Sequence, residues 1–224
     1  EHPEKAKKKR KRFPKHRLEA RAYKFALGPK SAQTDRMFAI LEPLWWLRNE
    51  MVVFLEAERK VNRERKIAGE TDVEYTERAG LYKMTSKLAE ENEALGNVHS
   101  HLRQNVAVRV IGGTKRWLEA VKEGRTHVKP PKPIDRQKYR SFTFPEYGNG
   151  CRIQNGRLFI SGVGWVKMFN HRKVRGKNKT ITVKFAQGRW WCVVTAQIFA
   201  VDLYEKADES KPDTAIDPGL THLM

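Results

Sequence analysis

The sequence predicts an α+β fold: a small antiparallel β-barrel with a helical bundle inserted between its first and second strands. Three observations support this prediction. Apolar residues alternate with period two over residues 18–27, recur at helical spacing between residues 31 and 121, and return to period two from residue 141. Many short strands separated by glycine turns are typical of a small barrel.

The first strand is expected to bury one face, which carries Tyr23, Phe25 and Leu27. Gly28-Pro29 ends this strand. Ser31 is expected as the N-cap of the helix that follows, whose apolar residues continue to residue 55. Pro43 lies within that pattern and is predicted to kink the helix or divide it in two.

Two further helices are expected to complete the bundle. Residues 71–74 match a capping box, which predicts a second helix running towards Gly96. Asn97 is the expected cap of a third helix, and Gly124 its expected end. The apolar stripe of that third helix consists of Val98, Leu102, Val106, Val110, Trp117 and Val121.

The composition changes at the Pro-rich residues 129–133, and strands are predicted beyond them. Asn155-Gly156 is a strong signal for a type I′ hairpin, and Gln187-Gly188 lies between the last two strands. Strands are expected at residues 141–144, 151–154, 157–160, 164–169, 179–186 and 189–199. The two cysteines, Cys151 and Cys192, lack metal-ligand spacing and are expected to be reduced core residues.

The charge indicates a polyanionic partner. The 224 residues carry a formal net charge of +19, with 32% charged and 39% hydrophobic residues. Residues 1–17 form a basic tail, expected to be disordered when free. A membrane partner is disfavoured because no apolar run approaches the roughly 18 residues of a membrane span, and no signal peptide is recognisable. Nucleic acid is therefore the favoured partner.

Residues 213–220 read Asp-Thr-Ala-Ile-Asp-Pro-Gly-Leu and follow a polar linker. Asp217 is a candidate ligand for Mg²⁺ (or Mn²⁺), because hard cations prefer carboxylate oxygens and nucleases hold such ions on rigid strands. The alternative is an ordinary turn aspartate before Pro-Gly. His99 and His101 lie two apart on an expected helix, so they should point about 200° apart and share no metal. No zinc site is expected.

Three segments resemble the TnpB proteins of insertion sequences and their relatives, the compact type V CRISPR effectors and the eukaryotic Fanzor proteins. Residues 156–198 (GRLFISGVGWVKMFNHRKVRGKNKTITVKFAQGRWWCVVTAQI) give the clearest match. Residues 23–34 (YKFALGPKSAQT) resemble the opening strand-to-helix turn of that family, and residues 215–220 (AIDPGL) resemble its first RuvC motif. In the first helix only Asn49 matches.

The resemblance implies a wedge-type, OB-like barrel at residues 18–28 and 137–206. It implies a helical recognition lobe at 29–128, a Pro-rich linker at 129–136, and the linker and start of an RNase H-like RuvC domain at 207–224. The implied activity is RNA-guided, Mg²⁺-dependent cleavage of double-stranded target DNA, with Asp217 as the first catalytic carboxylate. The later carboxylates would lie past Met224, so the chain alone is expected to bind but not cut. No small-molecule substrate and no membrane partner are expected.

The basic loop at residues 170–179 is expected to hold the backbone of a guide RNA, because a hairpin end can supply cations without fixed geometry. Trp190 and Trp191 should point to opposite faces of their strand, one into the core and one free to stack a base. The nucleic-acid-binding candidates are Trp165, Lys167, Arg172, Lys173, Arg175, Lys177, Lys179, Arg189 and Trp191.

Two other functions stay open at this point. One is a nuclease-dead, RNA-guided DNA-binding repressor, and the other is a generic basic RNA-binding protein without a guide. The expected compartment is the cytoplasm or nucleoid for a prokaryotic protein and the nucleus for a eukaryotic one.

Overall fold

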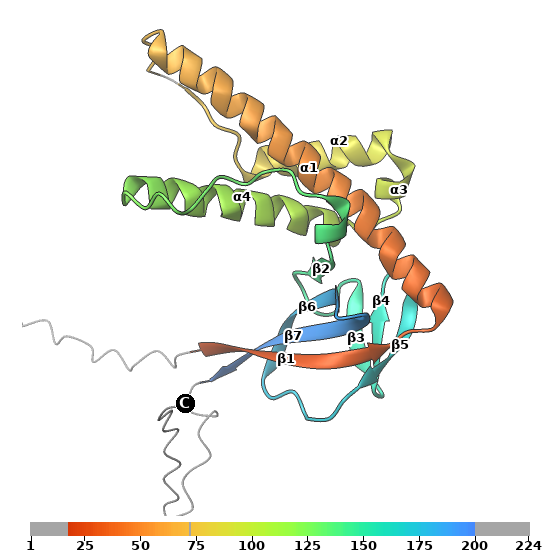
Figure 1. Ribbon diagram of the computed structural model, residues 1–224. Helices are drawn as coiled ribbons and strands as arrows, with labels where there is room; N and C mark the ends of the chain where they lie inside the picture. Colours follow the sequence, from red (N-terminus) through yellow and green to blue (C-terminus); the bar gives the residue numbers. More distant parts are fainter. Residues whose placement is uncertain (1–17, 72, 200–224) are drawn as a thin grey trace, which may run out of the picture.

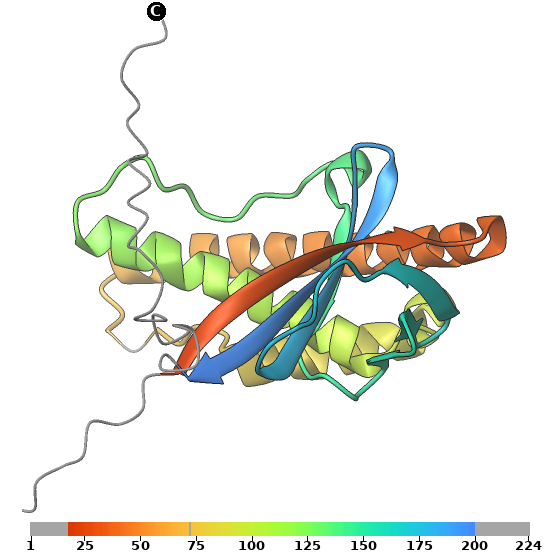
Figure 2. The same ribbon diagram turned by 90° about the horizontal axis from the view of Figure 1, so that it is seen from below.

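The computed structural model describes residues 18–71 and 73–199 and has an α+β fold (Figure 1). The helices form a layer at one end of a strongly curled antiparallel sheet (Figures 1 and 2). The elements are β1 (Leu18–Gly28), α1 (Ser31–Ile67), α2 (Arg78–Glu91), α3 (Glu93–Gly96), α4 (Ser100–Lys122), the 3₁₀ turn η1 (Arg136–Lys138), β2 (Ser141–Phe144), β3 (Cys151–Gln154), β4 (Arg157–Ile160), β5 (Gly164–Phe169), β6 (Lys177–Ala186) and β7 (Arg189–Phe199).

The sheet has seven strands in the order β2-β6-β7-β1-β5-β4-β3. The first strand of the chain, β1, therefore lies in the middle of the sheet. It pairs with β7 from Leu18↔Phe199 to Ala26↔Trp191, and its last residues pair with β5. Within the described residues, the four α-helices lie between β1 and β2 in the chain order.

The predicted small barrel is an open half-barrel within the described residues, because the edge strands β2 and β3 do not pair with each other. The loop between β2 and β3 connects the two sides of the sheet through hydrogen bonds of Tyr147. Tyr147 donates its backbone N–H to the Lys179 carbonyl (2.8 Å), and its hydroxyl accepts from the Ile153 N–H (3.0 Å). The curl is therefore held by a side chain where a barrel would have strand pairing.

The buried face of the sheet follows the predicted alternation. Tyr23, Phe25 and Leu27 are at most 7% exposed. The predicted facing of β6 and β7 is also confirmed by the pairs Ile181↔Val194, Val183↔Cys192 and Phe185↔Trp190. Alternation thus puts every second residue of these strands into one core and the others on the outward face.

Both predicted two-residue turns have positive φ at their central residues, as the type I′ turn predicted at Asn155-Gly156 requires. Asn155 and Gly156 have φ of 49° and 67°, and Gln187 and Gly188 have φ of 53° and 72°. Positive φ at both central residues matches the twist of the flanking strands. These turns fix the register of the β3–β4 and β6–β7 hairpins.

Both cysteines are buried and unpaired, which confirms them as reduced core residues. Burial raises the pKa of the Cys151 thiol to about 12 and does the same for Cys192. Thiolates are the reactive form, so neither side chain is poised for chemistry.

The first helix differs from the prediction at two points. Its N-cap is Lys30 rather than Ser31: the Lys30 N–H donates to the Gln33 side-chain oxygen (3.1 Å), which fixes the turn one residue earlier. Pro43 does not divide the helix, which runs unbroken for 37 residues. Proline removes a single intrahelical hydrogen bond, and the buried turn around it, with Leu41, Leu44 and Leu47, supplies apolar packing that offsets the loss.

The second helix begins at Arg78, so the predicted capping box at residues 71–74 is wrong; Asp72 itself lies outside the described residues. The segment is held extended against α1 instead. Asn62, 4% exposed, donates to the Glu74 carbonyl (2.7 Å), and Glu58 accepts from the Thr76 N–H (2.8 Å). These side chains bind backbone groups that a helix would have used internally.

The third long helix is capped by His99 and not by Asn97, since the His99 ring nitrogen accepts from the His101 N–H (3.3 Å). The predicted stripe is buried from Val98 to Val110 only. Beyond it Trp117 is half-buried and Val121 is 55% exposed, whereas the neighbouring Ala120 is fully buried.

The segment after α4 runs back along the helices to the sheet (Figure 2). Asn49 binds it through both amide atoms: its nitrogen donates to the Ile134 carbonyl (2.9 Å) and its oxygen accepts from the Ile134 N–H (3.1 Å). Trp45 donates to the same carbonyl and Arg48 to that of Lys132. None of the described helices contains a stretch long and apolar enough to cross a membrane.

Candidate nucleic-acid interface

The predicted binding residues divide between two faces of the sheet. Side chains at successive positions of a strand point to opposite sides. In β1, Tyr23 belongs to the buried face and Lys24 and Ala26 to the outward face. Trp165, Lys167, Arg189 and Trp191 lie on the outward face, whereas Arg172, Lys173 and Arg175 lie near Tyr23 on the other side.

A row of three residues crosses β3, β4 and β5 on the outward face. Arg152 pairs with Phe159, and Phe159 pairs with Trp165. The two ring centroids are 5.4 Å apart, and the Arg152 guanidinium lies 5.3 Å from each centroid. This is a cation–π arrangement in which a planar cation is positioned over aromatic surface.

Cations also lie over the other aromatic residues of this face. The Lys24 ammonium is 3.9 Å from the centroid of Trp191, and the Arg189 guanidinium is 5.8 Å from it. Lys167 lies 5.1 Å from the ring centroid of Phe169. Trp190 is 2% exposed, and the half-buried Trp191 donates its ring N–H to the Ala186 carbonyl (3.2 Å), so the predicted opposition of the two tryptophans is confirmed.

The basic loop is not a hairpin end, which corrects the prediction. It joins β5 to β6, and β1 and β7 lie between those two strands in the sheet. Residues 170–176 therefore cross over the sheet, and the His171 ring lies 5.4 Å from that of Phe25 on the buried face. A crossing loop is held at more points than a hairpin tip, so its cations are better positioned.

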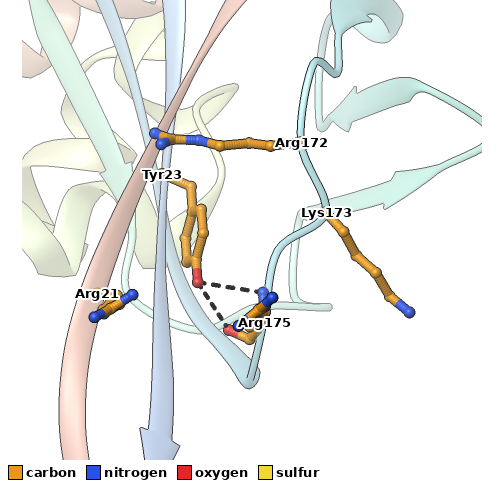
Figure 3. Close-up of a pocket in the computed structure, with 5 residues that line it drawn as sticks. All are labelled: Arg21, Tyr23, Arg172, Lys173 and Arg175. Carbon is orange, nitrogen blue, oxygen red and sulfur yellow. Dashed lines mark hydrogen bonds between the residues drawn. The ribbon is translucent and has the colours of Figure 1, made fainter. Parts of the chain in front are cut away.

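Tyr23 anchors this loop (Figure 3). Its hydroxyl accepts from the Arg175 N–H (3.3 Å) and lies 3.5 Å from the Arg175 carbonyl, to which it donates. Arg172 reaches across the ring, with its guanidinium 5.4 Å from the centroid. Together with Arg21 and Lys173, these residues line a hollow of about 330 Å³ that has four cationic side chains and no carboxylate in its lining.

Lys177 and Lys179 do not join this group, because both belong to β6. The ladder with β7 is irregular between Asn178 and Thr180, and the carbonyl of the intervening Lys179 accepts from Tyr147. Lys177 pairs with Gln197. The structure thus places two of the five predicted loop cations along a strand.

His99 and His101 are closer together than the sequence predicted. Their ring centroids are 5.5 Å apart because His99 is the extended N-cap residue and not part of the helix. Burial, with smaller effects of His101 and Arg103, lowers the pKa of His99. Among residues 18–71 and 73–199, no three His, Cys, Asp or Glu side chains are grouped to hold a metal ion. Asp217 lies outside the described residues.

Several residues of these two faces were missed by sequence reasoning: Arg21, Tyr23, Lys24, Ala26, Arg152, Phe159 and Phe169. The Arg152–Phe159 pair has a sequence signal, because the Asn155-Gly156 turn sets its register. The contact of Tyr23 with Arg175 spans 152 residues and has no such signal.

Comparison with known proteins adds no family assignment. No protein-family model and no curated protein matches the chain. Its function is therefore inferred from the geometry of the two faces and from the resemblance found in the sequence.

The loop geometry depends on Gly176, which has φ of 89° and passes so close to β7 that a Cβ would lie 2.5 Å from the Gln197 carbonyl oxygen. We expect Gly176→Ala to lower the free energy of unfolding by about 1–2 kcal/mol for the left-handed backbone and a further 1–3 kcal/mol for the clash. Urea denaturation of the purified chain measures this.

The matched control is Gly188→Ala, at φ of 72° with nothing within 4 Å of its added Cβ. Its free energy of unfolding should fall only by the amount due to the left-handed backbone. Equal losses in the two variants would mean that the loop is not held against β7.

Proposed function

We propose that the chain is the nucleic-acid-binding part of an RNA-guided DNA endonuclease of the TnpB type. The observation that carries the proposal is the hollow around Tyr23, which Arg21, Arg172, Lys173 and Arg175 line. The resemblance of residues 156–198, 23–34 and 215–220 to that family supports the guided-nuclease assignment.

The hollow suits phosphate groups. Phosphate contacts supply most of the sequence-independent affinity of nucleic-acid-binding proteins, and cations that line one hollow from two chain segments raise the local potential more than a dispersed set does. Tyr23 is 7% exposed and fixes the loop through the Arg175 backbone, so binding needs little further ordering of the chain. The guide RNA is the proposed ligand.

The helices between β1 and β2 are the proposed recognition lobe. In RNA-guided systems base pairing reads the target sequence, while the protein reads duplex shape and a short adjacent motif. Double-stranded target DNA is accordingly the second proposed partner of the helical layer and half-barrel.

Asp217 is proposed as a ligand for Mg²⁺ (or Mn²⁺) in the nuclease site. Such an ion stabilises the attacking and leaving oxygens of phosphodiester hydrolysis. The described residues contain no group of three His, Cys, Asp or Glu side chains that could hold a metal ion. The other ligands of such an ion are implied by the family resemblance alone.

The double variant Arg172→Gln/Lys173→Gln tests the hollow. We expect about tenfold weaker binding of a 12-nucleotide single-stranded RNA at 0.15 M salt, and a slope of log K against log salt that is smaller by roughly 1 to 1.5. Fluorescence anisotropy over a salt series measures both quantities.

The control is Lys60→Gln/Arg63→Gln, which removes the same charge from exposed positions on α1. It should change affinity far less. If both double variants lose the same affinity, the chain binds through its net charge alone and the hollow has no special part.

RNA that co-purifies with the chain from its native host after a high-salt wash separates the guided and unguided functions. We expect one discrete species with a constant scaffold and a variable end. Sequencing of that RNA is the measurement. A mixture of ribosomal and messenger RNA fragments would instead indicate a generic RNA-binding protein without a guide.

Asp217→Ala, placed in a polypeptide that includes a complete nuclease domain, should abolish Mg²⁺-dependent cleavage of guide-matched DNA because the metal loses a ligand. RNA retention should be unchanged. Cleavage at the wild-type rate would remove Asp217 from the metal site, and absence of cleavage in the parent protein would favour the nuclease-dead repressor.

A further inference from the structure

The outward face contains a second hollow, separate from the one around Tyr23. One of its lining residues is Ala26, which pairs with Phe169 of β5 on one side and with Trp191 of β7 on the other. The small alanine thus lies between two aromatic residues in one row across three strands. Neighbouring strands are about 4.8 Å apart, so the flanking side chains start about 9.6 Å from each other.

The hollow has a volume of about 430 Å³ and is lined by Ala26, Leu27, Phe169 and Arg189. Its two walls differ in kind. On the β5 side Phe169, 50% exposed, lies against Gly28, where an added Cβ would be 3.1 Å from the ring. On the β7 side the Arg189 guanidinium lies 5.8 Å from the Trp191 centroid, so a planar cation supported by an indole forms the wall.

These dimensions suit one planar ring. Stacked bases lie about 3.4 Å apart, so a base held between two flat groups needs roughly 7 Å between them. The side chains that flank Ala26 start about 9.6 Å apart, which leaves room for one ring. Phenylalanine and arginine are both surfaces on which nucleobases stack.

The charge around the hollow indicates that the planar group belongs to a nucleic acid. Lys24 precedes Ala26 on the same face of β1, and Lys167 precedes Phe169 on the same face of β5. The two ammonium groups therefore flank the hollow, where the phosphates on either side of a bound nucleotide would lie. Its four lining residues include no carboxylate.

We propose that this hollow is a slot for one unpaired nucleobase of a single-stranded nucleic acid, stacked between Phe169 and Arg189 over Ala26. The inference rests on the proposed nucleic-acid-binding function. It adds contacts with a base, whereas the hollow around Tyr23 contacts phosphates. A base in a duplex cannot enter the slot because it stays paired and stacked in the double helix, so the slot selects single-stranded segments.

The test compares two ligands and a matched pair of variants of the full chain. The ligands are a 12-nucleotide RNA and an abasic ribose-phosphate oligomer of the same length. Ala26→Leu fills the slot, whereas Ala22→Leu adds the same side chain at an exposed position four residues earlier on the same face of β1. Anisotropy titrations give the affinities.

We expect the parent chain to bind the RNA about tenfold more tightly than the abasic oligomer, which is within the range measured for one stacked base. Ala26→Leu should remove that difference, and Ala22→Leu should keep it. Phe169→Leu, whose side chain is half exposed, is the second variant should Ala26→Leu fail to fold; it too should remove the difference.

Equal binding of the two ligands by the parent chain would overturn the slot, as would equal effects of the two leucine variants. Either result leaves the proposed function standing as long as Arg172→Gln/Lys173→Gln weakens binding of both ligands. The experiment therefore distinguishes failure of the base-slot proposal from failure of the proposed function of the hollow around Tyr23.

Discussion

The position of β1 in the middle of the sheet is the constraint on which the other features depend. This strand starts the described chain yet pairs with β7, which ends it, so the half-barrel forms only when both ends of the described chain are together. The helices must then leave the sheet after Gly28 and return through β2. Because β1 is central, its two faces line both hollows: Tyr23 anchors the loop on one side and Ala26 lines the second hollow on the other.

The placement of like charges is the second physical feature of the interface. Concentrating cations is unfavourable unless each is stabilised locally, and the structure does this with aromatic rings. Arg172 lies over the ring of Tyr23, and both Lys24 and Arg189 lie over Trp191. Arg152 lies over the Phe159–Trp165 pair. Such contacts cost little when a polyanion binds, because the cation can hold ring and phosphate together. A surface built this way stays positively charged and ordered before its ligand arrives.

The helical layer shows how local signals were overruled by contacts between elements. Residues 71–74 have the sequence of a capping box, but the next helix starts only at Arg78 because Asn62 and Glu58 of α1 bind the intervening backbone. Likewise Pro43 lies in an unbroken helix, since packing on its apolar neighbours outweighs one lost hydrogen bond. Asn49, the one residue of this helix that matches the resembled family, binds the backbone of the returning segment.

The sequence by itself determined the α+β class, the strands and their turns, the buried faces of β1, β6 and β7 and the positive net charge. These follow from periodicity, from Asn-Gly and Gln-Gly turns and from net charge, all of which act within a few residues or over the chain as a whole. Only the tertiary structure decided that the barrel stays open, that the basic loop crosses the sheet, and that Tyr23 meets Arg175 across 152 residues. The order of strands in the sheet sets these contacts, and strand order depends on which long-range pairs bury most surface together, a quantity that no local pattern records.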